Sequence, residues 1–215
     1  YYAGHYASGS YNTFVGSNAG QGGTTSAPYS SGASNTALGY QALTAFTTGD
    51  ENTAVGNSAL TSNTTATGNT AVGMYASRQN ETGEGNTAVG SQALMGASGN
   101  SHSYNTAVGR GAIQSVTTAA GNTAIGFGAG DSITTSGYNA LLGYQVGQAL
   151  AGGSGLNVVI GYQSLYYGTG NTKVIAIGTR AGYNTTSDSN VYIGGSAGRE
   201  NRDGTGQVYI GSQAG

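Results

Sequence analysis

A short apolar run ends on glycine twelve times along the 215-residue chain, always in the same five-residue frame. The steps between these repeat glycines are 23, 17, 17, 17, 19, 17, 17, 18, 17, 16 and 17 residues. A fixed period of this size is the signature of a repeat architecture, because each unit is too small to bury a core alone and must stack on its neighbours. The repeat glycines are Gly16, Gly39, Gly56, Gly73, Gly90, Gly109, Gly126, Gly143, Gly161, Gly178, Gly194 and Gly211.

Each repeat unit predicts a short strand followed by tight turns. The frame reads Asn, Thr or an aliphatic residue, a small or aromatic residue, an aliphatic residue and Gly, as in residues 86–90 (NTAVG). The 41 glycines supply the positive φ angles that such turns require. We therefore expect an all-β fold, a parallel β-solenoid of about 17 residues per rung and about 12 rungs, in which residues 1–215 form a single domain.

The position directly before the repeat glycine is Val, Leu or Ile in every copy, so we expect it to be the core column. Side chains two apart share a strand face. The residue two earlier, Thr in the first seven copies, is therefore expected to be inward or half buried, with hydroxyls bonding along the stack. The residue between them, usually Ala as in Ala54, faces the other way and is a candidate contact between chains. The core column is Val15, Leu38, Val55, Val72, Val89, Val108, Ile125, Leu142, Ile160, Ile177, Ile193 and Ile210.

Asparagine opens the frame in ten of the twelve copies, and Val174 and Gln207 replace it in the other two. Stacked side-chain amides hydrogen-bond along the axis of parallel β arrays. We expect such an Asn ladder to fix the register between rungs. Its members are Asn12, Asn35, Asn52, Asn69, Asn86, Asn105, Asn122, Asn139, Asn157 and Asn190.

All changes in repeat length fall between frames, where insertions in solenoids form loops. Residues 21–34 are the largest excursion and contain Pro28, the single proline. The chain begins and stops in mid-pattern. We expect it to be a segment of a longer fibre protein.

Composition argues against several partners. Charged residues are 7% of the chain and the formal net charge is −2, and the six Lys and Arg are scattered, whereas binding to nucleic acid needs a basic patch. No run of about 18 apolar residues predicts a membrane helix, so no membrane contact is expected in this segment. Glycine-rich calcium repeats need an Asp in every turn, and no metal or cofactor site is predicted.

The chain is also poor in catalytic groups, with eight Asp and Glu and two His. His5 and His102 lie in Gly/Ser-rich loops without acidic neighbours, which predicts solvated loop histidines. The close acidic pairs are Asp50 with Glu51, Glu81 with Glu84, and Glu200 with Asp203. These pairs lie in loops, where acids serve solubility. We therefore expect the protein not to be an enzyme.

The frames NTALGYQAL at 35–43, NTAVGNSAL at 52–60 and NTAVGSQAL at 86–94 resemble the head repeats of trimeric autotransporter adhesins of the YadA type, and more closely the repeats of phage-type tail-fibre proteins. The resemblance covers the whole chain, although the adhesin period is about 14 rather than about 17 residues. It implies a left-handed β-roll, a homotrimer or fibre, and an extracellular place on a virion tail fibre or a bacterial cell surface.

Three other functions compete with a structural shaft or head for attachment. The loops could bind surface glycans, since Tyr presents an apolar body with a polar tip and the chain has 16 of them. A polysaccharide-degrading spike would need paired carboxylates. An ice-binding solenoid would need two hydroxyl columns on one exposed face, whereas the column beside Thr is aliphatic in all copies.

Overall fold

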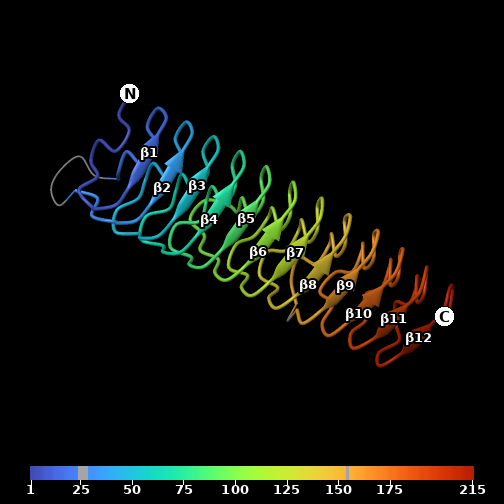
Figure 1. Cartoon of the computed structure of the whole chain (residues 1–215). Helices are drawn as coiled ribbons and strands as arrows, with labels where there is room; N and C mark the ends of the chain where they lie inside the picture. Colours follow the sequence, from blue (N-terminus) through green and yellow to red (C-terminus); the bar gives the residue numbers. More distant parts are fainter. Residues whose placement is uncertain (24–28, 154) are drawn as a thin grey trace.

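The computed structural model describes residues 1–23, 29–153 and 155–215, so Pro28 lies outside the described residues. Its strands stack in chain order along a rod from the N-terminal to the C-terminal end (Figure 1). No helix in the described ranges is long and apolar enough to cross a membrane. The twelve strands are β1 (Thr13–Val15), β2 (Thr36–Leu38), β3 (Thr53–Val55), β4 (Thr70–Val72), β5 (Thr87–Val89), β6 (Thr106–Val108), β7 (Thr123–Ile125), β8 (Ala140–Leu142), β9 (Val158–Ile160), β10 (Ile175–Ile177), β11 (Val191–Ile193) and β12 (Val208–Ile210).

The strands form one parallel sheet of twelve strands in the order β1 to β12. Neighbouring strands pair so that equivalent positions of the repeat lie side by side. Thr53, Ala54 and Val55 of β3, for example, pair with Thr70, Ala71 and Val72 of β4. We call each strand with the loop that follows it a rung. The predicted all-β parallel solenoid with rungs about 17 residues apart is confirmed.

The repeat glycine allows the rungs to stack closely. At Gly56 the backbone φ is +134°, a conformation that L side chains rarely adopt. A Cβ at this position would lie 2.5 Å from the carbonyl oxygen of Gly73 in the next rung. No other residue fits there without moving the rungs apart.

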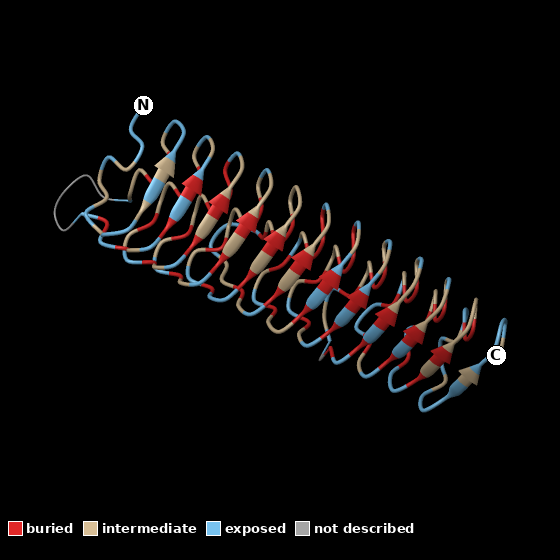
Figure 2. Ribbon diagram, in the orientation of Figure 1, coloured by how far each residue is buried: buried red, intermediate tan, exposed pale blue. Residues whose placement is uncertain are grey.

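The strands turn the opposite face inward from the one expected. The middle residue of each strand points into the coil, and Figure 2 shows it as the buried part of β2 to β11. The aliphatic column lies outside, and side chains at its ends are half exposed, such as Val15 at 53% and Leu38 at 47%. The expected core column is therefore wrong at each of its positions, none of which is fully buried: Val15, Leu38, Val55, Val72, Val89, Val108, Ile125, Leu142, Ile160, Ile177, Ile193 and Ile210.

Two related expectations change with it. The Thr column faces outward, with four of its seven side chains half buried as expected and Thr13, Thr36 and Thr123 exposed. Among the described residues none of its hydroxyls forms the expected hydrogen bond along the stack. The Ala column, including Ala37 and Ala54, is fully buried inside the coil and is closed to contact with another chain.

The reason is the narrowness of the coil. Its interior receives the middle residue of the strand, the residue three positions after the repeat glycine, and the next one, which in rung 3 are Ala54, Ala59 and Leu60. Two bulky residues per strand would overfill this space, since interiors are already close-packed. One small strand residue and one Leu from the turn fill it.

Where the strand residue is Phe, Tyr or Leu, the residue four positions after the repeat glycine is glycine. Tyr192 is fully buried, and a Cβ at Gly198 would lie 2.0 Å from its ring. Phe14 stands against Gly20 in the same way, at 2.2 Å. This exchange of volume between two sequence positions shows that both point into one interior.

The Asn ladder is confirmed as a hydrogen-bonded column. The Oδ1 of Asn52 accepts the backbone N–H of Asn69 at 3.0 Å and its side-chain Nδ2–H at 3.2 Å. The Nδ2 of Asn52 donates to the carbonyl oxygen of Ala66 at 2.8 Å. The side chains from Asn35 to Asn157 and that of Asn190 are buried, and each links its rung to the next, as where the Oδ1 of Asn190 accepts the backbone N–H of Gln207 at 2.8 Å. Asn12 at the first rung accepts the backbone N–H of Asn35 at 2.8 Å but is only partly buried.

Candidate functional site

The strongest candidate for a functional surface is the outer face, which we define as the first and third residues of the twelve strands. It contains Thr, Val, Leu, Ile and Ala and no charged residue. Strands about 4.8 Å apart and three residues long make it roughly 55 Å by 10 Å, on the order of 500 Å². An area of about 500 Å² is comparable to the largest apolar patches of soluble monomers, which often mark interaction sites, and here seven of its 24 side chains are Thr.

The outer face changes character along the rod. Its first column is Thr from Thr13 to Thr123, so hydroxyls alternate with aliphatic side chains in β1 to β7. From Ala140 onward this column is Ala, Val or Ile, and both columns are then apolar. Val158 and Ile175 in this region are each 37% exposed.

A second surface feature lies on the turn directly after the outer face. Phe127, Tyr144 and Tyr162 follow the repeat glycine in three consecutive rungs. Their ring centroids are 5.2 and 5.3 Å apart and their planes lie within 12° and 10° of each other. Each side chain is at least 40% exposed. Stacking of the rungs thus turns single aromatic residues into a row.

The two histidines occupy different environments. His5 is exposed, as expected for a loop residue. His102, expected to be solvated, is 1% exposed, and neither ring nitrogen has a hydrogen-bond partner in the described structure. Burial lowers the pKa of His102 from 6.5 to about 4. The expectation for His102 is wrong because its loop folds into the coil, where an unpaired ring must stay neutral.

Carboxylates of the close acidic pairs bind backbone N–H groups of loops or neighbouring arginine side chains. The Asp50 carboxylate accepts the backbone N–H of Ala33 at 2.7 Å, and Glu81 accepts that of Gly99 at 3.1 Å. Glu200 forms exposed ion pairs with Arg199 and Arg202 at 3.5 and 3.8 Å. Among the described residues no three His, Cys, Asp or Glu side chains group where a metal could bind.

A scan of family models, a search of curated proteins and a search of solved structures give no significant match to this chain.

Proposed function

We propose that this chain is a structural segment of an extracellular fibre, a shaft or head that associates with further copies of itself and presents a surface for attachment. The observation that carries the proposal is the uncharged outer face, which continues over all twelve strands and which no element of the described ranges covers. The resemblance to phage-type tail-fibre and YadA-type repeats supports a homotrimer and a place on a virion or a bacterial surface.

A second and third copy are the occupants that fit the outer face best. The face repeats rung by rung along the whole rod, so an identical rod side by side meets a matching surface at every step. It carries no charge that association would have to desolvate. Mobile loops of an unrelated partner would not match a surface that is straight and periodic over twelve strands.

Energetics favour association only over many rungs. Burying the exposed half of one aliphatic side chain is worth about 1 kcal/mol. Eight aliphatic side chains of the outer face are 37–66% exposed, so they supply on the order of 8 kcal/mol per chain, against about 4–15 kcal/mol that association costs. Full-length contact is therefore needed, which suits a fibre rather than a local docking site.

Sedimentation equilibrium of the purified chain tests the proposal. We expect a trimer, and we expect Ile177→Lys combined with Val89→Lys to give folded monomers, because both charges would be buried between copies. Thr118→Lys is the matched control, since Thr118 is exposed on the loop side, and it should remain trimeric. A wild-type monomer at high micromolar concentration, or a trimer that survives both lysines on the outer face, would contradict association through this face.

Ice binding is a second candidate, favoured by one observation. The seven Thr from Thr13 to Thr123 stand in register on an open flat sheet and are exposed or half exposed. The triple variant Thr53→Val, Thr70→Val and Thr87→Val separates the two functions. Self-association should persist in it, whereas thermal hysteresis in the wild type that disappears in the variant would establish ice binding instead.

Release of reducing sugars from capsular polysaccharide would establish the degrading spike.

A further inference from the structure

Two consecutive rungs lack a side chain in a column where the others have one. This column, which we call the turn column, is the second residue after the repeat glycine, and it is glycine only at Gly111 and Gly128. Elsewhere it carries residues such as Gln92 and Gln145 at φ angles of +61° and +50°, close to the +66° and +59° of the two glycines. The backbone therefore does not require glycine there, and the missing side chains leave a hollow.

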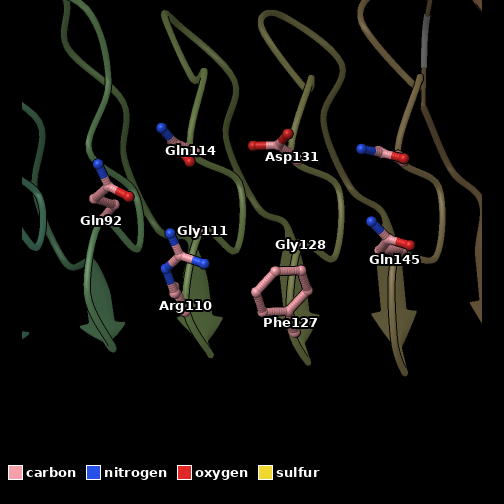
Figure 3. A pocket seen from close by; sticks show the side chains of 9 residues that line it. Gln92, Arg110, Gly111, Gln114, Phe127, Gly128, Asp131 and Gln145 are labelled. Atoms are coloured by element: carbon pink, nitrogen blue, oxygen red, sulfur yellow. The ribbon is translucent and has the colours of Figure 1, made fainter.

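The hollow has a volume of about 250 Å³ and defined walls (Figure 3). Gln92 and Gln145 close its two ends along the rod axis. Arg110 and Phe127 form the wall nearer the strands and lie side by side in Figure 3. The Cζ of Arg110 is 5.6 Å from the centroid of the Phe127 ring. Gln114 and Asp131 lie on the opposite side in Figure 3, and Gln148 also lines the hollow.

The polar groups around the hollow are available for a ligand. Among the described residues, the side chains of Gln92, Gln114 and Gln148 make no hydrogen bond to protein, and Arg110 has no ion-pair partner. The Asp131 carboxylate likewise accepts no hydrogen bond, although it is half buried and burial raises its pKa. Three amides and a carboxylate thus surround the hollow without hydrogen-bond partners, whereas the Arg110 guanidinium packs over the Phe127 ring and Gln145 accepts a hydrogen bond from Gln163.

We propose that this hollow binds one uncharged pyranose unit of a surface glycan. The apolar C–H face of a pyranose packs against the exposed part of the Phe127 ring between Arg110 and Tyr144, and its hydroxyls exchange hydrogen bonds with the surrounding amides. Asp131 and Arg110 are bidentate partners for neighbouring hydroxyls, and their opposite charges leave no net attraction for a charged sugar. The volume lies below the roughly 300–1,000 Å³ of pockets for drug-sized ligands, which suits a single ring.

The row of rings gives the site a direction. Tyr144, whose ring centroid is 5.2 Å from that of Phe127, and Tyr162 continue the aromatic surface along the rod beyond the hollow. A glycan held by one unit in the hollow would extend along this row. The attachment role of such binding rests on the proposed fibre function, whereas the binding itself depends only on the hollow.

Saturation-transfer NMR of the whole chain tests the site. The probes are the methyl pyranosides of glucose, galactose, mannose, N-acetylglucosamine and N-acetylgalactosamine, with glucosamine and glucuronate as charged counterparts. We expect at least one uncharged probe to bind with a millimolar or lower Kd. Affinity should fall at least tenfold in the double variant Gly111→Gln and Gly128→Gln, which fills the hollow, and about tenfold in Phe127→Ser.

The filling variant should fold, because Gln occupies the same turn position in other rungs. A Cβ at Gly128 would lie 3.5 Å from Gln145, an ordinary contact, and one at Gly111 would lie 3.2 Å from the mobile end of Gln114. Ser196→Gln adds the same side chain to the turn column outside the hollow and should leave binding unchanged.

Three results would overturn the inference: no uncharged probe binds, the filled variant binds as well as the wild type, or a charged sugar binds more tightly than its neutral counterpart. Sedimentation separates this outcome from the fibre proposal. A trimer that binds none of the sugars refutes the hollow alone, and a monomer that binds a sugar through the hollow refutes self-association alone.

Discussion

The N-terminal part of the rod, β2 to β6, and the C-terminal part, β8 to β12, use different side chains for the same coil. In the first, Ala in the strand is combined with Leu or Ile in the turn in four of the five rungs, as with Ala54 and Leu60, and Thr lies outside. In the second, Leu141, Tyr192 and Tyr209 stand against glycine in three of the five rungs, Val159 is combined with Leu165 in another, and both outer columns are apolar. The interior is therefore limited in total volume, whereas the polarity of the outer face varies along the rod.

The largest effect should come from giving a C-terminal rung the large turn residue of the N-terminal rungs. Gly198→Leu places a side chain where a Cβ alone would approach the Tyr192 ring to 2.0 Å, so we expect a loss of about 3 kcal/mol or more in the free energy of unfolding. Adding Tyr192→Ala should restore at least half of that loss, because the pair then matches Ala54 with Leu60. Urea denaturation of the single and double variants measures both. A double variant no more stable than Gly198→Leu would show that the two positions do not share one interior.

Acid should weaken the N-terminal part selectively, since His102 lies in the rung of β5 and is buried without a partner. Its folded pKa of about 4 lies below the unfolded value of 6.5, so the unfolded chain binds the proton first as the pH falls. Stability is full above pH 6.5 and should decline to a loss of about 3 kcal/mol near pH 4.

Hydrogen exchange at pH 7 and pH 4.5 resolves where the acid effect acts. Amides around His102 should lose protection, whereas those of β10 to β12 should not. His102→Leu should remove the pH dependence of this region. Equal losses in both parts, or an unchanged profile in the variant, would assign acid sensitivity to other groups.

The Asn ladder offers a smaller effect. Asn86→Val introduces the residue found naturally at Val174 in a C-terminal rung. The Asn86 side chain accepts the backbone N–H of Asn105 at 3.0 Å and donates to the carbonyl oxygen of His102 at 2.6 Å, so both backbone groups would lose their partner. We expect a loss of about 2 kcal/mol from these unsatisfied groups. Gln207→Val at the exposed last rung is the control, and thermal unfolding should shift little there. Equal shifts at both positions would contradict a specific role for the buried ladder.

The smallest effect should follow from making the N-terminal outer face as apolar as the C-terminal one. Thr53→Val, Thr70→Val and Thr87→Val change outward side chains, so the free energy of unfolding should move by less than about 0.5 kcal/mol for each change. Self-association should tighten several-fold, because three more hydroxyls leave the contact between copies. Weaker association, measured by sedimentation, would show that the Thr column makes specific contacts in the assembly.

Much of this fold follows from the linear repeat. The period placed every strand, since β1 to β12 end one residue before the repeat glycines. The Asn column predicted both register and hydrogen bonding, and buried Asn52 bears it out. The facing of the strands was mispredicted because a three-residue strand such as Thr53–Val55 offers too short an alternation to separate a core face from an association face.

A signal for the correct facing was nonetheless present. Phe14 and Tyr192 occur in the middle of the strand with Gly20 and Gly198 after the turn, whereas Ala54 occurs with Leu60. Such a paired change in size indicates two positions that share an interior. The hollow at Gly111 and Gly128 was not predicted, because a missing side chain forms a site only when the surrounding rungs are stacked around it.

The repeat, the strand positions and the register can be predicted from the residues alone, because these depend on glycine, on amide ladders and on spacing along the chain. Which strand face closes inward, which histidine is buried and which side chains surround a hollow emerge only when the rungs are stacked. Those outcomes depend on the width of the coil and on contacts between residues about 17 positions apart, where volume rather than residue type determines what fits.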